Sequence, residues 1–463
     1  MRNISITFLM VTVLTVWGAA QALPAATGGG ISDTTGQASA SSPAPITGQG
    51  GSLEYTSELG RSNYFRGGLA FTTAFDDNVL NTDTDPISDV SYSILPHFAL
   101  DQSRGRLKWT LDYAGGVTIY QRITSRNQGS HSAGFETEYR ISPHVTFRLN
   151  DRFNDTTTFF SADNNNFTSP AGGVLQSPNN FVITPLAREL GNFTQAETDY
   201  QVGAGTIVGG SGSYYFSRYS DVTNGAANTS SLLDTKSEQA QGFITHRITP
   251  RNWSGLTYRF QRLTFGSGDN ETIAHSILYF HTIYLQPSMT LSLFAGPEYT
   301  DVSSRVVSQV IQLPLILVIS TPVAHQSWSA SGGATFAWQG LHTSAQASFV
   351  RRTTDGGGVL GAVRTNTVDA TLRRQISRSS SILGGFTYGT NDSIDFLSTP
   401  GSSIRVASGR LGFERRLGNN LLASVGYSRD HQVESATNVP SGNIDHNRAW
   451  ITIAYDFSRP LGR

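Results

Sequence analysis

Cysteine is absent from all 463 residues of the chain. Its absence excludes a disulfide framework, thiolate metal sites and cysteine nucleophiles. Lysine is nearly absent as well: Lys108 and Lys236 are the lysines, and the remaining basic residues among the 33 are arginines. The 34 acidic residues bring the formal net charge to −1. Neither sign dominates, so the charge balance predicts no nucleic-acid partner.

Long apolar runs are also scarce. At the amino terminus, residues 4–17 are uncharged and mainly apolar; they follow the basic residue Arg2 and precede the small-x-small sequence Ala-Gln-Ala at 20–22. This order predicts a cleaved signal peptide over residues 1–22. The alternative is a membrane anchor, but a spanning helix needs ~20 apolar residues, which this run does not supply.

The other apolar run covers residues 306–323 and includes Gln309, Gln312, Pro314 and Pro322. A spanning helix there would place two amides in lipid and a proline in its interior, which is energetically expensive. If the chain crosses a membrane, we therefore expect it to do so with strands.

The composition is polar on average yet rich in aromatic residues and glycine: 38% of the residues are hydrophobic, 10% are aromatic and 47 are glycines. This mixture fits a soluble all-β protein, such as a sandwich or β-helix, or an outer-membrane barrel with a polar interior. Residues 23–52 consist mainly of Ala, Gly, Ser, Thr and Pro, which predicts disorder. We expect a disordered periplasmic linker over 23–62, one barrel domain over 63–457 and a short extension over 458–463.

Alternation with a period of two dominates the central region. Residues 65–75, 90–100 and 107–119 each place large apolar side chains on one face and smaller or polar ones on the other. Such alternation predicts β-strands with one wet face. Several of these strands run for ten or more residues, whereas soluble strands average 5–6 and a bilayer crossing needs ~9–11. The length favours a transmembrane, antiparallel, up-and-down β-barrel.

The connections between the strands alternate in length, as in outer-membrane barrels with short turns on one side and long loops on the other. The predicted short turns lie at 101–104, 142–143, 209–211, 249–252, 286–288, 339–340, 377–380 and 418–420. The predicted long loops lie at 76–88, 122–130, 156–192, 221–232, 266–270, 301–324, 353–361, 393–403 and 432–445. Eight turns and nine loops give eighteen strands, with sixteen or twenty as alternatives, and place both termini on the short-turn side.

The last predicted strand has apolar residues at alternate positions and ends in two aromatic residues: Ile451, Ile453, Tyr455 and Phe457. This pattern resembles the carboxy-terminal assembly signal of bacterial outer-membrane barrels, although six residues follow Phe457. The region 63–457 resembles poorly characterised porin-like barrels, some of which are associated with exopolysaccharide or exosortase systems. The resemblance implies a bacterial outer-membrane location, contact with outer-membrane lipid and recognition by the barrel-assembly machinery.

If the apolar faces contact lipid, the charged residues on the opposite faces line the lumen, since an arginine at the lipid midplane costs ~2–4 kcal/mol. Arginine suits carboxylate or phosphate ligands, so such a lumen can bind anionic solutes or sugars. The alternative is that these charges pair across strands and brace the wall. The pore-lining candidates are Arg66, Lys108, Asp112, Glu136, Glu138, Arg140, Arg148, Arg152, Arg259, Asp369, Arg373, Arg410, Glu414 and Arg416.

Three predicted loops have unusual sequences. Loop 156–192 either folds inward and narrows the pore or remains an ordinary exposed loop. Apolar loop 301–324 extends two strands above the membrane, plugs the mouth or meets a partner. Loop 76–88 contains Asp76, Asp77, Asp83 and Asp85, which form either a divalent-cation site or, as we expect, a solvated acidic loop.

The sequence predicts a porin-like channel for small polar or anionic solutes. One alternative is a structural or export component, for example in exopolysaccharide secretion, with a periplasmic partner bound through the linker. The least favoured alternative is a membrane-embedded hydrolase, because neither H-E-x-x-H nor G-x-S-x-G occurs. We therefore expect no enzymatic activity, no catalytic residue, no cofactor and no metal.

Overall fold

The computed structural model describes residues 63–157, 182–184, 187–220, 232–266, 270–312, 315–394, 402–436 and 439–461. Within these ranges the chain forms eighteen β-strands and one 3-10 turn, Thr124–Arg126. The strands are β1 (Tyr64–Asp76), β2 (Asp89–Arg104), β3 (Leu107–Tyr120), β4 (Gln128–Arg140), β5 (Val145–Thr157), β6 (Arg188–Gly203), β7 (Thr206–Ser220), β8 (Thr235–Thr249), β9 (Asn252–Phe265), β10 (Asn270–Gln286), β11 (Met289–Gln312), β12 (Leu315–Gln339), β13 (Thr343–Gly356), β14 (Leu360–Ser377), β15 (Ser380–Ser393), β16 (Ser403–Leu417), β17 (Leu421–Ala436) and β18 (Val439–Pro460).

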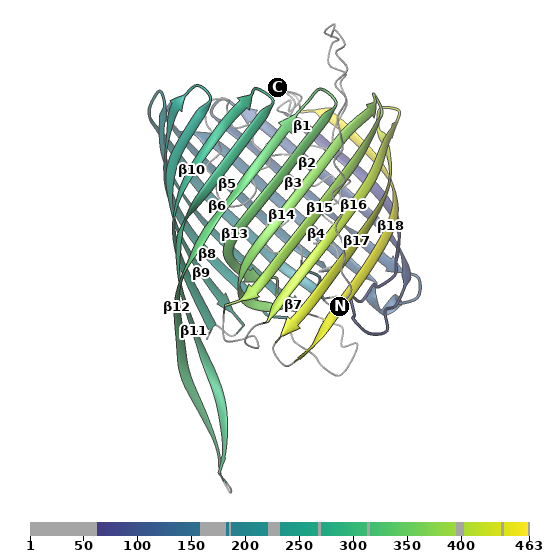
Figure 1. The fold of residues 1–463 in the computed structure, drawn as a ribbon. Helices are drawn as coiled ribbons and strands as arrows, with labels where there is room; N and C mark the ends of the chain where they lie inside the picture. The colour runs from purple at the N-terminus through teal and green to yellow at the C-terminus, as the bar shows by residue number, and fades with distance from the viewer. Residues whose placement is uncertain are drawn as a thin grey trace, which may run out of the picture.

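Each strand pairs antiparallel with the next, and β1 also pairs with β18, from Tyr64 opposite Pro460 to Asp76 opposite Arg448. This last pairing closes the sheet into a barrel (Figure 1). The prediction of an eighteen-stranded, up-and-down barrel is confirmed. Tyr64 is also paired with Asp101, close to the first short turn, so both ends of the barrel chain lie at the short-turn rim.

Two of the predicted short turns are misplaced. β2 continues to Arg104, and the turn follows at Gly105, where φ is +60°. The predicted turn at 209–211 lies inside β7, and the chain reverses between Gly203 and Thr206 instead. A Cβ at Gly209 would clash with the ring of Phe243 on β8, so Gly209 provides room for a ring rather than a turn.

The outer and inner faces of the barrel differ in polarity. On β18 the outward side chains of Ile451, Ile453 and Tyr455 are about half exposed, whereas the inward Thr452 and Ala454 are buried. The same alternation around the barrel gives an apolar outer belt and a mainly polar inner wall. In the part of the chain that the structure describes, no helix is long and apolar enough to span a membrane.

One hairpin extends far beyond the rim that carries the long loops (Figure 1). β11 and β12 remain paired as far as Gln312 and Leu315, but β12 pairs with β13 only from Gly332 to Gln339. Of the three alternatives for residues 301–324, the backbone therefore shows an extension of two strands.

Candidate functional site

The structure places every predicted pore-lining charge on the inner face of the barrel, because the neighbouring residues along each strand carry the exposed apolar side chains. On β1 and β2, Arg66 donates a hydrogen bond to Asp101. Asp101 also accepts a hydrogen bond from Thr110 Oγ1 at 2.9 Å. On β3, Asp112 is buried against Gly134 of β4. Charges from the first three strands therefore meet on one part of the wall.

The next two strands continue this charged wall. Arg148 of β5 donates to Glu197 Oε1 at 2.8 Å and also binds Asp199, and its Nε lies 3.6 Å from Glu138 Oε2. Arg152 forms an ion pair with Glu136 of β4. One arginine thus contacts three carboxylates on two neighbouring strands.

Further pairs lie on other parts of the wall. Arg373 Nη2 of β14 lies 3.2 Å from Glu414 Oε2 of β16, and Arg259 Nη2 of β9 lies 3.2 Å from Glu298 Oε2 of β11. Arg140 Nε donates to Glu138 Oε1 at 3.2 Å, and Asp369 Oδ1 accepts a hydrogen bond from Thr387 Oγ1 at 2.8 Å. The remaining inner-face candidates are Lys108, Arg410 and Arg416.

The two members of a pair differ in their access to the lumen. The side chain of Arg373 is 54% exposed and that of Glu414 is 7% exposed. The side chain of Arg148 is 39% exposed, whereas its partner Glu197 is 12% exposed. Arg152 and Glu136 show the opposite order. At the first two pairs, a solute in the lumen would meet guanidinium groups before carboxylates.

The end of the β13–β14 hairpin leaves the wall and folds inward. Residues 353–356 and 360–363 are all buried, so the alternation of the barrel wall is lost there. At its tip, Gly358 lies against Tyr219 of β7, where a Cβ would approach the ring to 2.7 Å. Gly358 O also accepts a hydrogen bond from Leu233 N at 2.8 Å. The tip therefore contacts β7 and the segment before β8, neither of which is its neighbour in the sheet.

A buried polar contact holds the base of this hairpin. Thr353 Oγ1 donates to Glu298 Oε1 at 2.6 Å, and the other carboxylate oxygen of Glu298 binds Arg259. Glu298 and Arg259 are almost completely buried. Because a buried charge is costly unless it is paired, this arrangement favours the inward position of Thr353.

The described part of loop 156–192 also folds inward. Ile183 N donates to Gln432 Oε1 at 2.7 Å, and Gln432 Nε2 donates to Ile183 O at 2.9 Å. Val182 packs in an apolar cluster with four residues of β14 and β16, namely Leu360, Val363, Ile404 and Val406. A loop that follows β5 thus contacts β14, β16 and β17, on another part of the barrel wall. Residues 158–181 and 185–186 of this loop lie outside the described ranges.

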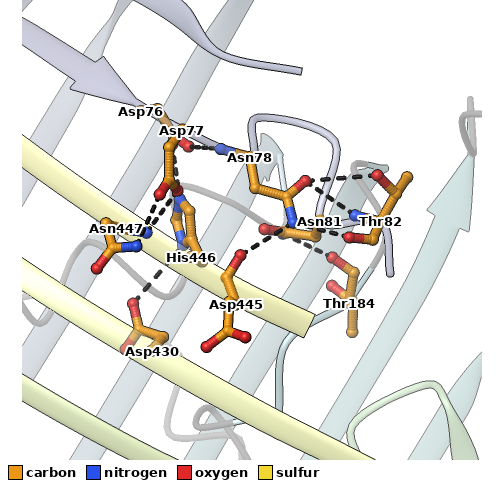
Figure 2. Close-up of polar contacts among 10 residues, drawn as sticks. All are labelled: Asp76, Asp77, Asn78, Asn81, Thr82, Thr184, Asp430, Asp445, His446 and Asn447. Carbon is orange, nitrogen blue, oxygen red and sulfur yellow. Dashed lines mark hydrogen bonds and ion pairs between the residues drawn. The ribbon is translucent and has the colours of Figure 1, made fainter. Parts of the chain in front are cut away.

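The acidic first loop is fixed by the last two strands (Figure 2). Asp76 Oδ2 binds His446 Nε2 of β18 at 2.7 Å, and His446 Nδ1 lies 3.6 Å from Asp430 Oδ2 of β17. Asp77 accepts hydrogen bonds from the backbone N and from Nδ2 of Asn447, each at 2.7 Å. The expectation of a solvated acidic loop is wrong for Asp76 and Asp77. Among the described residues, no group of acidic or histidine side chains could hold a metal ion.

His446 lies beyond the apolar belt, because its outward neighbours on β18 are Asp445 and Asn447. Burial lowers the pKa of His446, but its interactions with Asp430 and Asp76 outweigh that effect and raise the pKa to about 10. His446 is therefore a cation at neutral pH. It joins loop 76–88 to the barrel, and Asn81 of that loop donates to Thr184 O at 2.8 Å. Three inward elements thus gather at the long-loop end of the lumen: the first loop, residues 182–184 and the β13–β14 hairpin.

Comparisons with known proteins found similar solved structures at low sequence identity. No protein-family model matches the chain, and no curated protein matches it. Among solved structures, Pseudomonas aeruginosa OpdQ is similar at 10% identity and a TM-score of 0.40, with 85% of this chain and 98% of that chain covered. Pseudomonas aeruginosa OpdO is similar at 13% identity and a TM-score of 0.40, with 86% of this chain and 97% of that chain covered. At these low values, function has to be argued from the residues of the barrel itself.

Proposed function

We propose that the chain is a porin-like channel in a bacterial outer membrane that conducts small polar or anionic solutes. The closed barrel, its apolar outer belt and its charged inner wall support this proposal. In the same proposal, residues 1–22 are a signal peptide and residues 23–62 a periplasmic linker, and the outer belt contacts lipid. No catalytic step is part of the proposal.

The observation that carries the preference for anions is the unequal exposure of Arg148 and Arg373 and their carboxylate partners. Guanidinium groups that face a water-filled lumen attract anions and raise their local concentration. The partner carboxylates fix the position of each arginine, yet they are largely shielded from the solute. Opposite charges of similar number can therefore still give an anion-selective wall.

The test is single-channel recording of refolded residues 23–463 in a planar bilayer with a potassium chloride gradient. We expect stable current steps and a reversal potential that indicates chloride preference. The double variant Arg148→Gln/Arg373→Gln should lose most of that preference. The matched control is Arg415→Gln, because Arg415 lies on the outer face of β16, directly after Glu414.

Two results would overturn the proposal. Cation preference, or a preference that the double variant leaves unchanged, would reject the anion-selective wall. Insertion without any conductance would reject the channel, and a structural or export role with a periplasmic partner would then replace it. Folding of each variant is checked beforehand by the heat-dependent mobility of the barrel on a gel.

We also propose that Ile451, Ile453, Tyr455 and Phe457 form the signal that the barrel-assembly machinery recognises. These side chains lie on the outer face of β18, the strand that closes the barrel against β1. β18 continues through Ser458 and Arg459 to Pro460, so the signal would be read from within a strand.

A further inference from the structure

Three arginines form a patch on the outer face of β13 to β16: Arg351, Arg364 and Arg405. Each arginine lies an even number of residues from an exposed outward side chain of its own strand, namely Phe349 on β13, Val368 on β14 and Leu411 on β16. The strand register places Arg351, Asn366, Thr390 and Arg405 in one row across these four strands. Arg364 lies in the next row toward the long loops. The patch thus combines three guanidinium groups with two neutral hydrogen-bonding side chains.

An apolar row lies directly beside this polar one. Phe349, Val368 and Tyr388 are opposite one another on β13, β14 and β15, and their exposed fractions are 43%, 40% and 40%. Arg351 and Asn366 are each two residues away along their strands, on the side of the long loops. The apolar outer belt therefore ends at the arginine patch, and a molecule bound across this border must be amphiphilic.

The arginines of the patch outnumber the carboxylates beside them. Elsewhere on the outer face near the same rim, Arg188 is paired with Asp155 at 2.6 Å and Arg262 with Glu271 at 2.8 Å. Within the described part of the chain, by contrast, none of the three patch arginines forms an ion pair. Asp392 is opposite Arg364 in the row next to that of Arg351 and Arg405. Three arginines and one carboxylate leave the patch with a net positive charge. Asn366 Nδ2 donates to Thr390 Oγ1 at 3.1 Å, which orders the centre of the patch.

We propose that this patch binds the phosphate groups of a phosphorylated lipid in the outer leaflet, with the acyl chains of that lipid along Phe349, Val368 and Tyr388. Arginine binds phosphate through paired N–H donors. Arg351 and Arg405 are three strand spacings apart, roughly 14 Å at about 4.8 Å for each spacing, so two phosphates of one headgroup can each meet an arginine. The adjacent apolar row favours a lipid over free phosphate. This inference rests on the proposed placement in an outer membrane.

The experiment compares the wild-type barrel with the triple variant Arg351→Gln/Arg364→Gln/Arg405→Gln, both folded in dodecyl maltoside micelles. The probe is bisphosphorylated lipid A, and native mass spectrometry measures the bound fraction during a titration. Because each surface arginine contributes to the attraction of an anionic lipid, the variant, which lacks three of them, should bind about 100-fold more weakly. Monophosphorylated lipid A should bind the wild type more weakly than the bisphosphorylated form, and added salt should weaken both.

The matched control removes the same charge from the opposite rim of the same barrel segment, with Arg374→Gln/Arg378→Gln/Arg415→Gln. It should bind the probe like the wild type. Equal binding by the wild type and the patch variant, or an equal loss in both variants, would overturn the inference. Displacement of the lipid by an equal concentration of inorganic phosphate would also overturn it, because the patch would then be a free-anion site.

This test does not depend on conductance. A barrel that binds the probe through the patch but passes no current would leave the lipid site intact and reject only the channel. A conducting barrel that fails to bind the probe would reject only the lipid site.

Discussion

At the scale of single residues, charged side chains hold distant segments of this barrel together. His446 binds Asp76 from the other end of the sequence, and Glu298 joins Arg259 to Thr353. Buried charges are strongly destabilising once a partner is removed, since the remaining charge keeps its desolvation cost. Each such cluster therefore fixes one inward element rather than adding uniformly to the stability of the wall.

His446→Gln tests the first of these clusters. The substitution removes the imidazolium between the buried carboxylate of Asp76 and the largely buried carboxylate of Asp430, so we expect a loss of about 3 kcal/mol in the free energy of unfolding near pH 6. The pKa of His446 is raised from 6.5 to about 10. Its stabilisation is therefore complete below pH 6.5 and is lost as the pH rises through 10. Urea unfolding of the folded barrel at several pH values should show that the difference in the free energy of unfolding between wild type and variant decreases as the pH rises from 6.5 through 10.

His431→Gln is the control for that measurement. His431 lies on the neighbouring strand β17 and binds Asp445 at 2.9 Å, but its side chain is largely exposed. We expect a change within about 1 kcal/mol, as for other exposed ion pairs. If the loss of unfolding free energy caused by His446→Gln stayed constant from pH 6 to pH 10, the result would contradict the assigned role of the imidazolium.

At the scale of elements, the wall could be predicted from the sequence and the inward elements could not. Alternation along β1, β2 and β3 follows from local residue order, because one face meets an apolar environment and the other a polar one. Residues 353–361 have the glycine-rich, polar composition of an exposed loop. Their inward position depends on Glu298 and Tyr219, which are far away in the chain, and no local pattern encodes such contacts.

Sequence reasoning also identified the charges of the lumen without their partners. Period-two alternation predicts the inner face for Arg148 and Arg373, but it does not indicate Glu197 and Asp199 as the partners of Arg148. These carboxylates lie on β6, in the part of the sequence where the turn after β6 was misplaced. A shifted turn changes the register of both adjoining strands, and with it the pairs that can be recognised.

Thr353→Val tests whether the inward hairpin restricts the lumen. The substitution keeps the shape of the side chain and removes its hydrogen bond to the Glu298 carboxylate, a loss of about 1.5–3 kcal/mol. A less firmly held hairpin should give larger or more fluctuating single-channel currents. Thr387→Val is the matched control, because Thr387 makes the same kind of bond, 2.8 Å to Asp369, between two neighbouring wall strands. Unchanged currents in both variants would show that the hairpin does not limit conduction.

At the scale of the whole molecule, the barrel exists only because the first and last strands meet. Thirteen register pairs join β1 to β18, and the hydroxyl groups of Thr72 and Thr452 hydrogen-bond across the seam at 2.8 Å. Backbone pairing along this seam removes the two free edges that an open sheet would expose. Closure of the barrel therefore depends on the pairing of β1 with β18, the first and the last strand.

Phe457 occupies a specific place at this seam. Its ring lies over Gly67 of β1, where a Cβ would approach Cζ to 2.9 Å, and it packs edge-on against Phe65 with ring centroids 5.8 Å apart. Phe457→Ala should lower the free energy of unfolding of refolded barrels by about 1–2 kcal/mol, because the ring is only partly buried.

Assembly in cells separates this packing role from recognition. If the barrel-assembly machinery reads Phe457, the variant should give severalfold less folded barrel in the outer membrane, although it refolds in vesicles nearly as well as the wild type. Phe413→Ala is the control, since Phe413 is a partly exposed outward ring on β16, away from the seam. Equal losses for the two variants in cells would mean that Phe457 contributes packing alone, and the signal would then have to lie elsewhere in β18.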